Sequence, residues 1–190
     1  MKEEKEQIAA LKANDEAAFK ALVLQFQDRV YNTSLGILQN ESDAEDLSQE
    51  VFIEVFHSIN NFKGDATLAT WLYRITVNKC FDFIRKKNRK KRFALITSLF
   101  SEEGTLKDFP SFNHPGVLME NKERAAILFR AINLLPAQQR IAFTLHKVEG
   151  LSHQEISEIM STTVSSVESL VHRAKQNLRK RLEKFYEEEM

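Results

Sequence analysis

The chain has few of the residues that cross-link a protein or anchor it in a membrane. Its 190 residues include one cysteine, Cys80, so no internal disulfide can form and no cysteine pair offers a zinc site. The N-terminus has no apolar signal core, and no apolar run approaches the length that crosses a bilayer. These absences predict a cytoplasmic protein without membrane insertion.

Catalytic motifs are missing as well. The sequence contains no glycine-rich phosphate loop, no nucleophile paired with a base and no cluster of metal ligands, and its five histidines are scattered. Asp43, Asp46 and Glu50 could be metal ligands of a nuclease or an RNA-modifying enzyme, but they have no complementary cluster elsewhere. We therefore expect no enzyme, no catalytic residue, no metal and no cofactor.

The net charge is zero at neutral pH, yet charges of opposite sign are separated along the chain. Every residue from Arg85 to Arg92 except Asn88 is basic, and a second basic cluster lies between Arg173 and Lys184. Acidic residues gather between Glu41 and Glu54. Because separated basic stretches bind the phosphates of nucleic acids, the average charge does not exclude a DNA partner.

Apolar residues recur with helical spacing through most of the chain, and no strand pattern of comparable length is present. Small polar residues ahead of the apolar stripes predict where helices begin. The predicted caps are Asn14 or Asp15, Ser42 with Glu45 in a capping box, Thr67 before a helix that reaches to about Lys87, and Pro136 at the first position of a later helix. The pattern predicts an all-α protein.

Helical signals fail between about Phe93 and Val117, where glycines and prolines gather. We place a flexible linker at residues 93–118, and its many apolar residues predict that it lies against another surface. On this reading the linker joins two small helical domains, one at residues 1–92 and a four-helix one at residues 119–190.

The last part of the chain carries a helix-turn-helix pattern. Ser152 and Glu155 have the spacing of a capping box, and three small hydroxyl residues at 161–163 favour a turn. Ser165 and Glu168 repeat that spacing and open a second helix, whose polar face can hydrogen-bond to bases and phosphates. A helical hairpin with a solvated charged face is the alternative interpretation.

Two blocks of sequence resemble a single protein family. Residues 43–52, 62–67 and 70–78 closely resemble region 2 of extracytoplasmic-function sigma factors, the small specificity subunits of bacterial RNA polymerase. Residues 135–136, 150–152, 155–156 and 171–174 resemble region 4 of that family, in the same order. The resemblance implies a sigma factor that binds core RNA polymerase, docks the -35 promoter element as duplex and holds the melted -10 element. It leaves open whether an anti-sigma protein is a further partner.

The same resemblance implies roles for individual residues. For core polymerase these are Asp46, Gln49 and Glu50, and for the -10 element they are Phe62, Lys63, Gly64, Asp65, Trp71, Arg74, Asn78 and Lys79. For the -35 element they are Ser165, Ser166, Glu168, Ser169, His172 and Arg173, with Arg85, Lys86, Lys87, Arg179 and Lys180 at the phosphate backbone.

Several of these assignments have alternatives. The acidic residues could form a solvated face, and Trp71 could pack in the core. Many family members carry Lys or Arg where this chain has Glu168 and Leu170, and proline where it has Thr163. Glu168 is therefore either the capping partner of Ser165 or an acceptor for a cytosine amine. A helix-turn-helix regulator that acts without joining polymerase is the alternative function.

Overall fold

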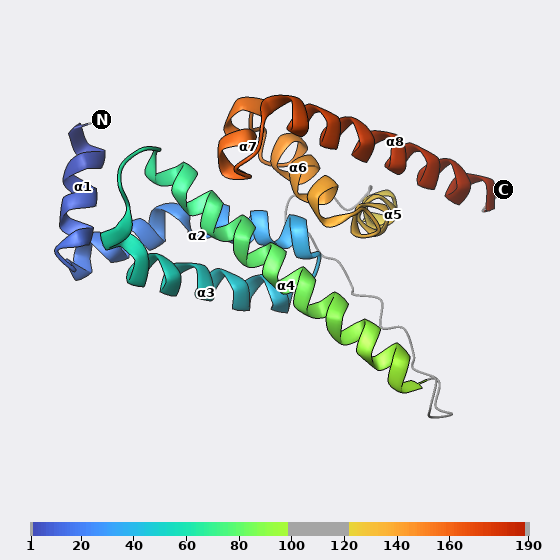
Figure 1. The fold of residues 1–190 in the computed structure, drawn as a ribbon, viewed down its shortest axis with the longest axis horizontal. Helices are drawn as coiled ribbons and strands as arrows, with labels where there is room; N and C mark the ends of the chain where they lie inside the picture. The colour runs from blue at the N-terminus through green and yellow to red at the C-terminus, as the bar shows by residue number, and fades with distance from the viewer. Residues whose placement is uncertain (1, 99–121, 189–190) are drawn as a thin grey trace.

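A computed structural model describes residues 2–98 and 122–188, and every regular element in these residues is a helix (Figure 1). The elements are α1 (Lys2–Lys12), α2 (Glu16–Leu38), α3 (Glu41–Ser58), the 3-10 turn η1 (Ile59–Asn61), α4 (Leu68–Ser98), α5 (Lys122–Asn133), α6 (Ala137–Lys147), α7 (His153–Ile159) and α8 (Val164–Glu188). The prediction of an all-α protein is confirmed.

In the N-terminal half, α2, α3 and α4 pack side by side around a shared core. The α3 helix contributes a stripe at spacings of three and four residues, which places one apolar face toward α2 and α4. The buried residues of that stripe are Ala44, Leu47, Val51 and Val55. The opposite face of α3, with the exposed acidic residues Glu45, Asp46 and Glu50, is left to solvent.

The predicted helix starts are partly confirmed. Asp15 caps α2, because its side chain accepts from the Ala18 N–H, and Thr67 accepts from the Thr70 N–H at the start of α4. The Ser42 capping box is wrong. Asn40 caps α3 instead, since its amide oxygen accepts from the Asp43 N–H at 2.8 Å, which places Ser42 and Glu45 inside the helix.

The long helix α4 continues past the predicted end at about Lys87 and reaches Ser98. Its final turns extend away from the other helices (Figure 1). The first residues of the predicted linker are therefore helical. The rest of that linker, and with it the prediction that its apolar residues lie against another surface, falls outside the described residues.

In the C-terminal half, α5, α6, α7 and α8 form a compact four-helix unit. The Ser152 capping box at the start of α7 is confirmed in both directions, and these hydrogen bonds lower the pKa of Glu155. The second capping box is wrong, because α8 begins at Val164 and its N-cap is Thr163, whose hydroxyl accepts from the Ser166 N–H at 3.2 Å. Pro136 precedes α6 as its N-cap, one position earlier than predicted.

The two halves pack against each other and share one continuous apolar core. Ile141 and Leu145 of α6 and Ile156 and Ile159 of α7 belong to the same buried cluster as the N-terminal helices. The end of α2, residues 33–39, is buried on every side because α6 covers the face that α3 and α4 leave open. The α4 helix, which carries several candidate -10 residues, and the helix-turn-helix are thus brought close together.

Candidate nucleic-acid interface

The second helix of the helix-turn-helix, α8, presents a polar face opposite its buried stripe. Val167, Val171, Ala174 and Leu178 are buried, so the helix is fixed by one side only. The candidate -35 residues Ser165, Glu168, Ser169, His172 and Arg173 are exposed along the free side, and Ser166 is half-buried beside its cap. A face of this kind can enter a major groove with its first turns against the base edges.

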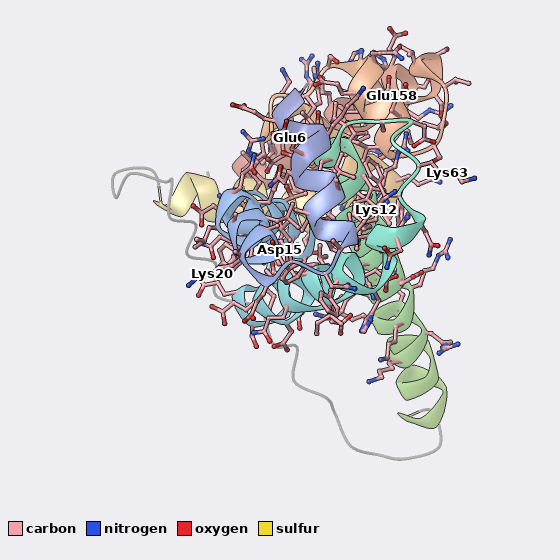
Figure 2. All side chains as sticks on the ribbon, turned by 90° about the vertical axis from the view of Figure 1, so that its left-hand side faces the viewer. Glu6, Lys12, Asp15, Lys20, Lys63 and Glu158 are labelled. Carbon is pink, nitrogen blue, oxygen red and sulfur yellow. The ribbon has the colours of Figure 1, made fainter. Side chains whose placement is uncertain are left out.

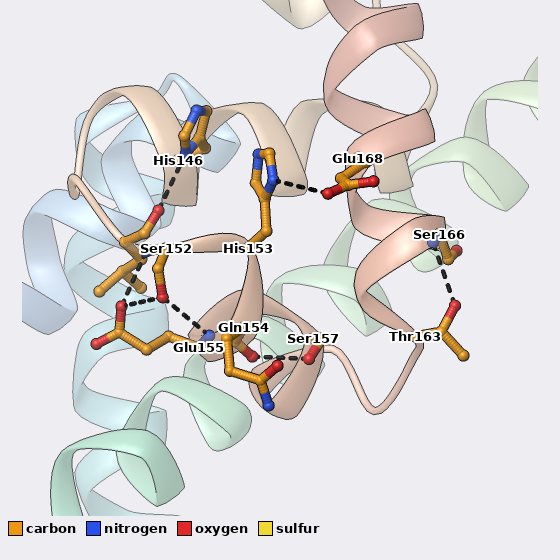
Figure 3. A network of polar contacts seen from close by, with 10 residues as sticks. His146, Ser152, His153, Gln154, Glu155, Ser157, Thr163, Ser166 and Glu168 are labelled. Carbon is orange, nitrogen blue, oxygen red and sulfur yellow. Dashed lines mark hydrogen bonds and ion pairs between the residues drawn. The ribbon is translucent and has the colours of Figure 1, made fainter.

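Glu168 lies next to a histidine that the sequence interpretation missed. The Nδ1 atom of His153, on α7, is 3.8 Å from the Glu168 Oε1 atom (Figure 3). The His153 ring packs on His146 with centroids 4.6 Å apart, and the His146 Nδ1 atom lies 3.0 Å from the Leu151 carbonyl oxygen. Because Thr163 and not Ser165 caps α8, Glu168 is no capping partner, and its carboxylate lies on the exposed face of α8.

A groove of about 440 Å³ opens at this point of the surface. It lies between α7 and α8, and all of its lining residues except Val171 have polar or charged side chains. The lining residues are His153, Glu168, Ser169, Val171, His172 and Lys175. The sequence pattern could not reveal the contribution of His153, because only folding of the turn brings α7 against the first turns of α8.

In the loop between η1 and α4, the candidate -10 residue Phe62 is buried. Its side chain is 3% exposed, and its ring packs against Trp71 with centroids 5.0 Å apart. The ring is thus covered by the core in this arrangement, and the role of Phe62 at the -10 element stays a prediction. Lys63, Gly64 and Asp65 at the tip of the loop are exposed. Trp71 is half-buried against the core, as the alternative interpretation held.

The remaining candidates on α4 differ in what they contact. Asn78 is exposed, so its amide is available to a partner. The Lys79 ammonium forms an ion pair with Glu54 at 3.2 Å. The Arg74 Nε atom donates to the main-chain carbonyl oxygen of Glu158 on α7 at 2.9 Å. One candidate for the -10 element is therefore engaged with the helix-turn-helix.

The basic residues expected at the phosphate backbone are all exposed, and some of them form ion pairs. Arg85 and Lys86 are exposed, and the Arg85 guanidinium lies 3.7 Å from Asp82. Lys87 is more constrained, because its ammonium pairs with Asp43 at 2.8 Å. On α8, Lys180 is exposed, and the exposed Arg179 pairs with Glu183 at 2.8 Å. Exposed ion pairs of this kind contribute about 0–1 kcal/mol, so phosphates can displace them.

The acidic face of α3 contains the three residues assigned to core polymerase. Asp46, Gln49 and Glu50 are all exposed and lie within about one helical turn. Two apolar side chains extend the same surface region, Ile53 at 57% exposure and Phe56 at 46%. The sequence interpretation missed both, although they lie outside the buried stripe. Exposed apolar side chains surrounded by charged side chains are typical of a protein-binding surface.

The contact between the two halves is polar as well as apolar. The Tyr73 hydroxyl of α4 donates to the Glu149 carboxylate at 3.2 Å. Burial raises the pKa of Glu149 above its usual value, and burial beside Glu149 raises the pKa of Tyr73 to about 12. Arg140 of α6 is buried in this contact and bonds the Asn133 side chain, and burial lowers its pKa. Among the described residues no carboxylate pairs with this guanidinium, and its Nε atom has no hydrogen-bond partner, so its burial costs stability.

Gly36 sets how closely α2 and α6 approach. A Cβ atom at Gly36 would lie 2.8 Å from the Thr144 Cγ2 atom, and the Thr144 hydroxyl lies 3.4 Å from the Gly36 carbonyl oxygen. Only a residue without a side chain fits this contact in its present geometry. The position of α6 on α2 therefore depends on this one glycine.

We expect Gly36→Ala to separate the two halves without unfolding them. The new methyl group collides with Thr144, whereas alanine inside a helix is favoured over glycine by about 1 kcal/mol. Distances between spin labels at the exposed positions Lys20 and Lys175 should broaden and lengthen. Adding Thr144→Ser, which removes the obstructing methyl group and keeps the hydroxyl, should restore the wild-type distance. A wild-type distance in Gly36→Ala alone would contradict the packing argument.

No helix among the described residues is both long enough and apolar enough to span a bilayer. In the same residues, histidine, cysteine, aspartate and glutamate side chains form no group of three that could bind a metal ion.

The fold defines a helical protein with the helix-turn-helix of a DNA-binding protein in one half and an exposed acidic face in the other. Comparison with known families gives the same division. The Sigma-70 region 2 family model matches residues 22–90, and the Sigma-70, region 4 model matches residues 125–178. The chain belongs to the sigma-70 family, in its extracytoplasmic-function group.

Similar proteins agree with this assignment. The RNA polymerase sigma-H factor of Pseudomonas aeruginosa is 31% identical, over 93% of this chain and 92% of its own length. The ECF RNA polymerase sigma-E factor of Escherichia coli is 32% identical, over 89% of this chain and 88% of its own. The chain is therefore a sigma factor, a protein that directs transcription initiation together with core RNA polymerase.

Two solved structures share the fold. CnrH, solved with the cytosolic domain of CnrY, matches with a TM-score of 0.66 and 21% identity, over 95% of this chain and 97% of CnrH. The sigma factor RpoE of Bartonella quintana, solved with the anti-sigma factor NepR, matches with a TM-score of 0.66 and 21% identity. That match covers 87% of this chain and 96% of RpoE.

Proposed function

We propose that the exposed face of α3 binds core polymerase, that α8 docks the -35 element, and that the loop before α4 holds the melted -10 element. The observation that carries the proposal is the division of surfaces between the halves. The acidic face at Asp46, Gln49 and Glu50 lies on one half, and the polar face of α8 lies on the other. A regulator that never joins polymerase would have no use for the first surface. An anti-sigma protein is a further proposed partner.

The proposed -35 contact uses two kinds of residue. Ser169 and Arg173 face outward in the first half of α8, where they can reach base edges, and Glu168 can accept from a cytosine amine. Arg179 and Lys180 lie further along the helix and are placed to neutralise phosphates, together with Arg85 and Lys86 in the other half. The two kinds of residue thus occupy different exposed positions along α8.

The proposed -10 contact uses the tip of the loop and one face of α4. Lys63, Gly64 and Asp65 offer a cation, a close-approach backbone and an acceptor, and Asn78 offers an amide. A base flipped out of the stack is held by such groups through its hydrogen-bonding edge. Phe62 has a supporting part in this scheme, because its buried ring fixes the start of the loop.

Binding both promoter elements requires the two halves to separate. The elements are centred about 25 base pairs apart, or about 85 Å at about 3.4 Å per base pair. Arg74 of the -10 surface, however, is in direct hydrogen-bond contact with Glu158 of the helix-turn-helix. We infer that the packed arrangement is a form of the free protein, and that polymerase and promoter hold an extended one.

Substitutions on α8 are expected to produce two separable effects. Replacing Arg179 or Lys180 by alanine should weaken binding to every sequence and lower the slope of log affinity against log salt by about one unit per lost phosphate contact. Replacing Ser169 or Arg173 should change the preferred base by about 1–3 kcal/mol per contact. Binding arrays over a duplex library at several salt concentrations measure both. A uniform loss for both groups would refute the base-reading role.

A further inference from the structure

The first helix holds both ends of the loop that precedes α4. The Lys12 Nζ atom donates to the Phe62 carbonyl oxygen at 2.7 Å, at the point where the loop begins. The Glu4 carboxylate accepts from the Leu68 N–H at 2.8 Å, at the point where the loop ends and α4 starts. Figure 2 shows Lys12 at the end of α1, beside the loop that carries Lys63. The helix therefore spans the loop from one end to the other.

Among the described residues, none holds the tip of the loop in a comparable way. Gly64 has a φ of +76°, and a Cβ atom there would meet nothing within 4 Å. Lys63 and Asp65 on either side are exposed. The Phe62 ring holds the first residue from inside, against Trp71. The conformation of the tip is therefore determined mainly by how its two ends are held.

Glu4 also completes the start of α4. The first N–H groups of a helix have no partners within it, and a carboxylate there interacts favourably with the positive end of the helix. Thr67 satisfies the Thr70 N–H, and Glu4 satisfies the Leu68 N–H. One of the two caps of α4 thus comes from a residue far away in the sequence, so the start of α4 depends on the position of α1.

We propose that α1 is a clasp for the -10 loop and that Glu4 and Lys12 are positioning residues for capture of the melted strand. This inference rests on the proposed function of the loop. It assigns a role to a helix that precedes residue 22, where the region 2 match begins. A loop that is ordered before it meets the strand loses less conformational entropy on binding, so it binds more tightly.

The test uses the full-length protein assembled with core polymerase. The probe is the single-stranded oligonucleotide that wild-type holoenzyme enriches most from a random pool. The variant Glu4→Ala with Lys12→Met removes both contacts, and we expect it to bind the probe about tenfold more weakly. Lys12→Arg alone keeps a donor and should retain most of the affinity. Binding of core polymerase and of -35 duplex should not change, because neither surface touches α1.

A control variant and a second measurement make the result decisive. Glu6→Ala with Lys5→Met makes the same changes of residue type at exposed positions of α1 and should bind the probe like wild type. Hydrogen exchange of the Leu68 amide should accelerate in the Glu4 and Lys12 variant and not in this control. Unchanged exchange would overturn the clasp, because the two side chains would then not hold the loop. An equal loss of probe affinity in the control would also overturn it.

Lys63→Ala with Asn78→Ala serves as the reference for the loop itself. If this pair weakens probe binding and loss of Glu4 and Lys12 does not, the clasp is wrong and the proposed -10 surface stands. If the Lys63 and Asn78 pair has no effect, the -10 assignment fails and the clasp fails with it. Weaker binding in both pairs, with accelerated exchange at Leu68, supports both.

Discussion

Reversing the charges of Asp46 and Glu50 to lysine is expected to weaken binding to core RNA polymerase about a hundredfold. Both carboxylates are exposed on one face of α3, so the substitutions should leave the fold intact. Placing like charges against a complementary partner surface costs several kcal/mol, and about 2.7 kcal/mol corresponds to a hundredfold change in affinity. Competition with labelled wild-type protein for core polymerase measures the effect.

A matched control reverses the charge of Glu16 and Asp28, which are exposed on α2. This variant should compete for core polymerase like wild type, and both variants should bind -35 duplex equally. Wild-type competition by the Asp46 and Glu50 variant would exclude the proposed surface. It would also favour a helix-turn-helix protein that regulates without joining polymerase. Replacing the exposed Ile53 by serine should add to the loss if the apolar residues belong to the same interface.

Replacing Phe62 by alanine should lower the free energy of unfolding by about 3–5 kcal/mol, a typical loss for a buried phenylalanine. The ring is 3% exposed, belongs to the main core and packs on Trp71. Urea unfolding of the full-length protein, followed by the fluorescence of its single tryptophan, measures the change. The neighbouring Lys63→Ala, at an exposed position, should shift stability by no more than about 0.5 kcal/mol.

The same pair of variants separates structure from DNA binding at the loop. Lys63→Ala should reduce capture of the single strand while the protein stays folded. A Phe62→Ala protein of wild-type stability that failed to melt promoters would contradict the buried position of the ring. It would instead favour a direct contact between the Phe62 ring and the melted strand.

Local signals predicted much of the helical framework. Asp15, Thr67 and Ser152 cap helices as predicted, because a cap is formed by residues three or four positions apart and needs no distant partner. The apolar stripes of α3 and α8 were likewise visible, because helical periodicity is a property of neighbouring turns. The two capping boxes that were wrongly predicted failed for the same reason. At Ser42 and Ser165 an earlier residue, Asn40 or Thr163, already supplied the cap.

Local sequence signals did not predict which candidate site residues are exposed. The sequence grouped Phe62 with Asn78 because both occur in the same family-like block, but it carried no information about which side chain faces the core. Folding buries the ring of Phe62 against Trp71 and leaves Asn78 in solvent. Burial depends on which helices pack across a residue, and that is set by contacts between distant segments.

The sequence alone determined the helical class, the helix-turn-helix, the segregated charges and the resemblance to sigma factors, since all of these reside in short stretches of residues. Only the tertiary structure decided that Glu4 and Lys12 hold the ends of a loop more than forty positions away, that His153 meets Glu168, and that Arg74 contacts the helix-turn-helix. Each of these contacts joins separate elements of the fold, and spacing along the chain says nothing about which surfaces of two elements will meet.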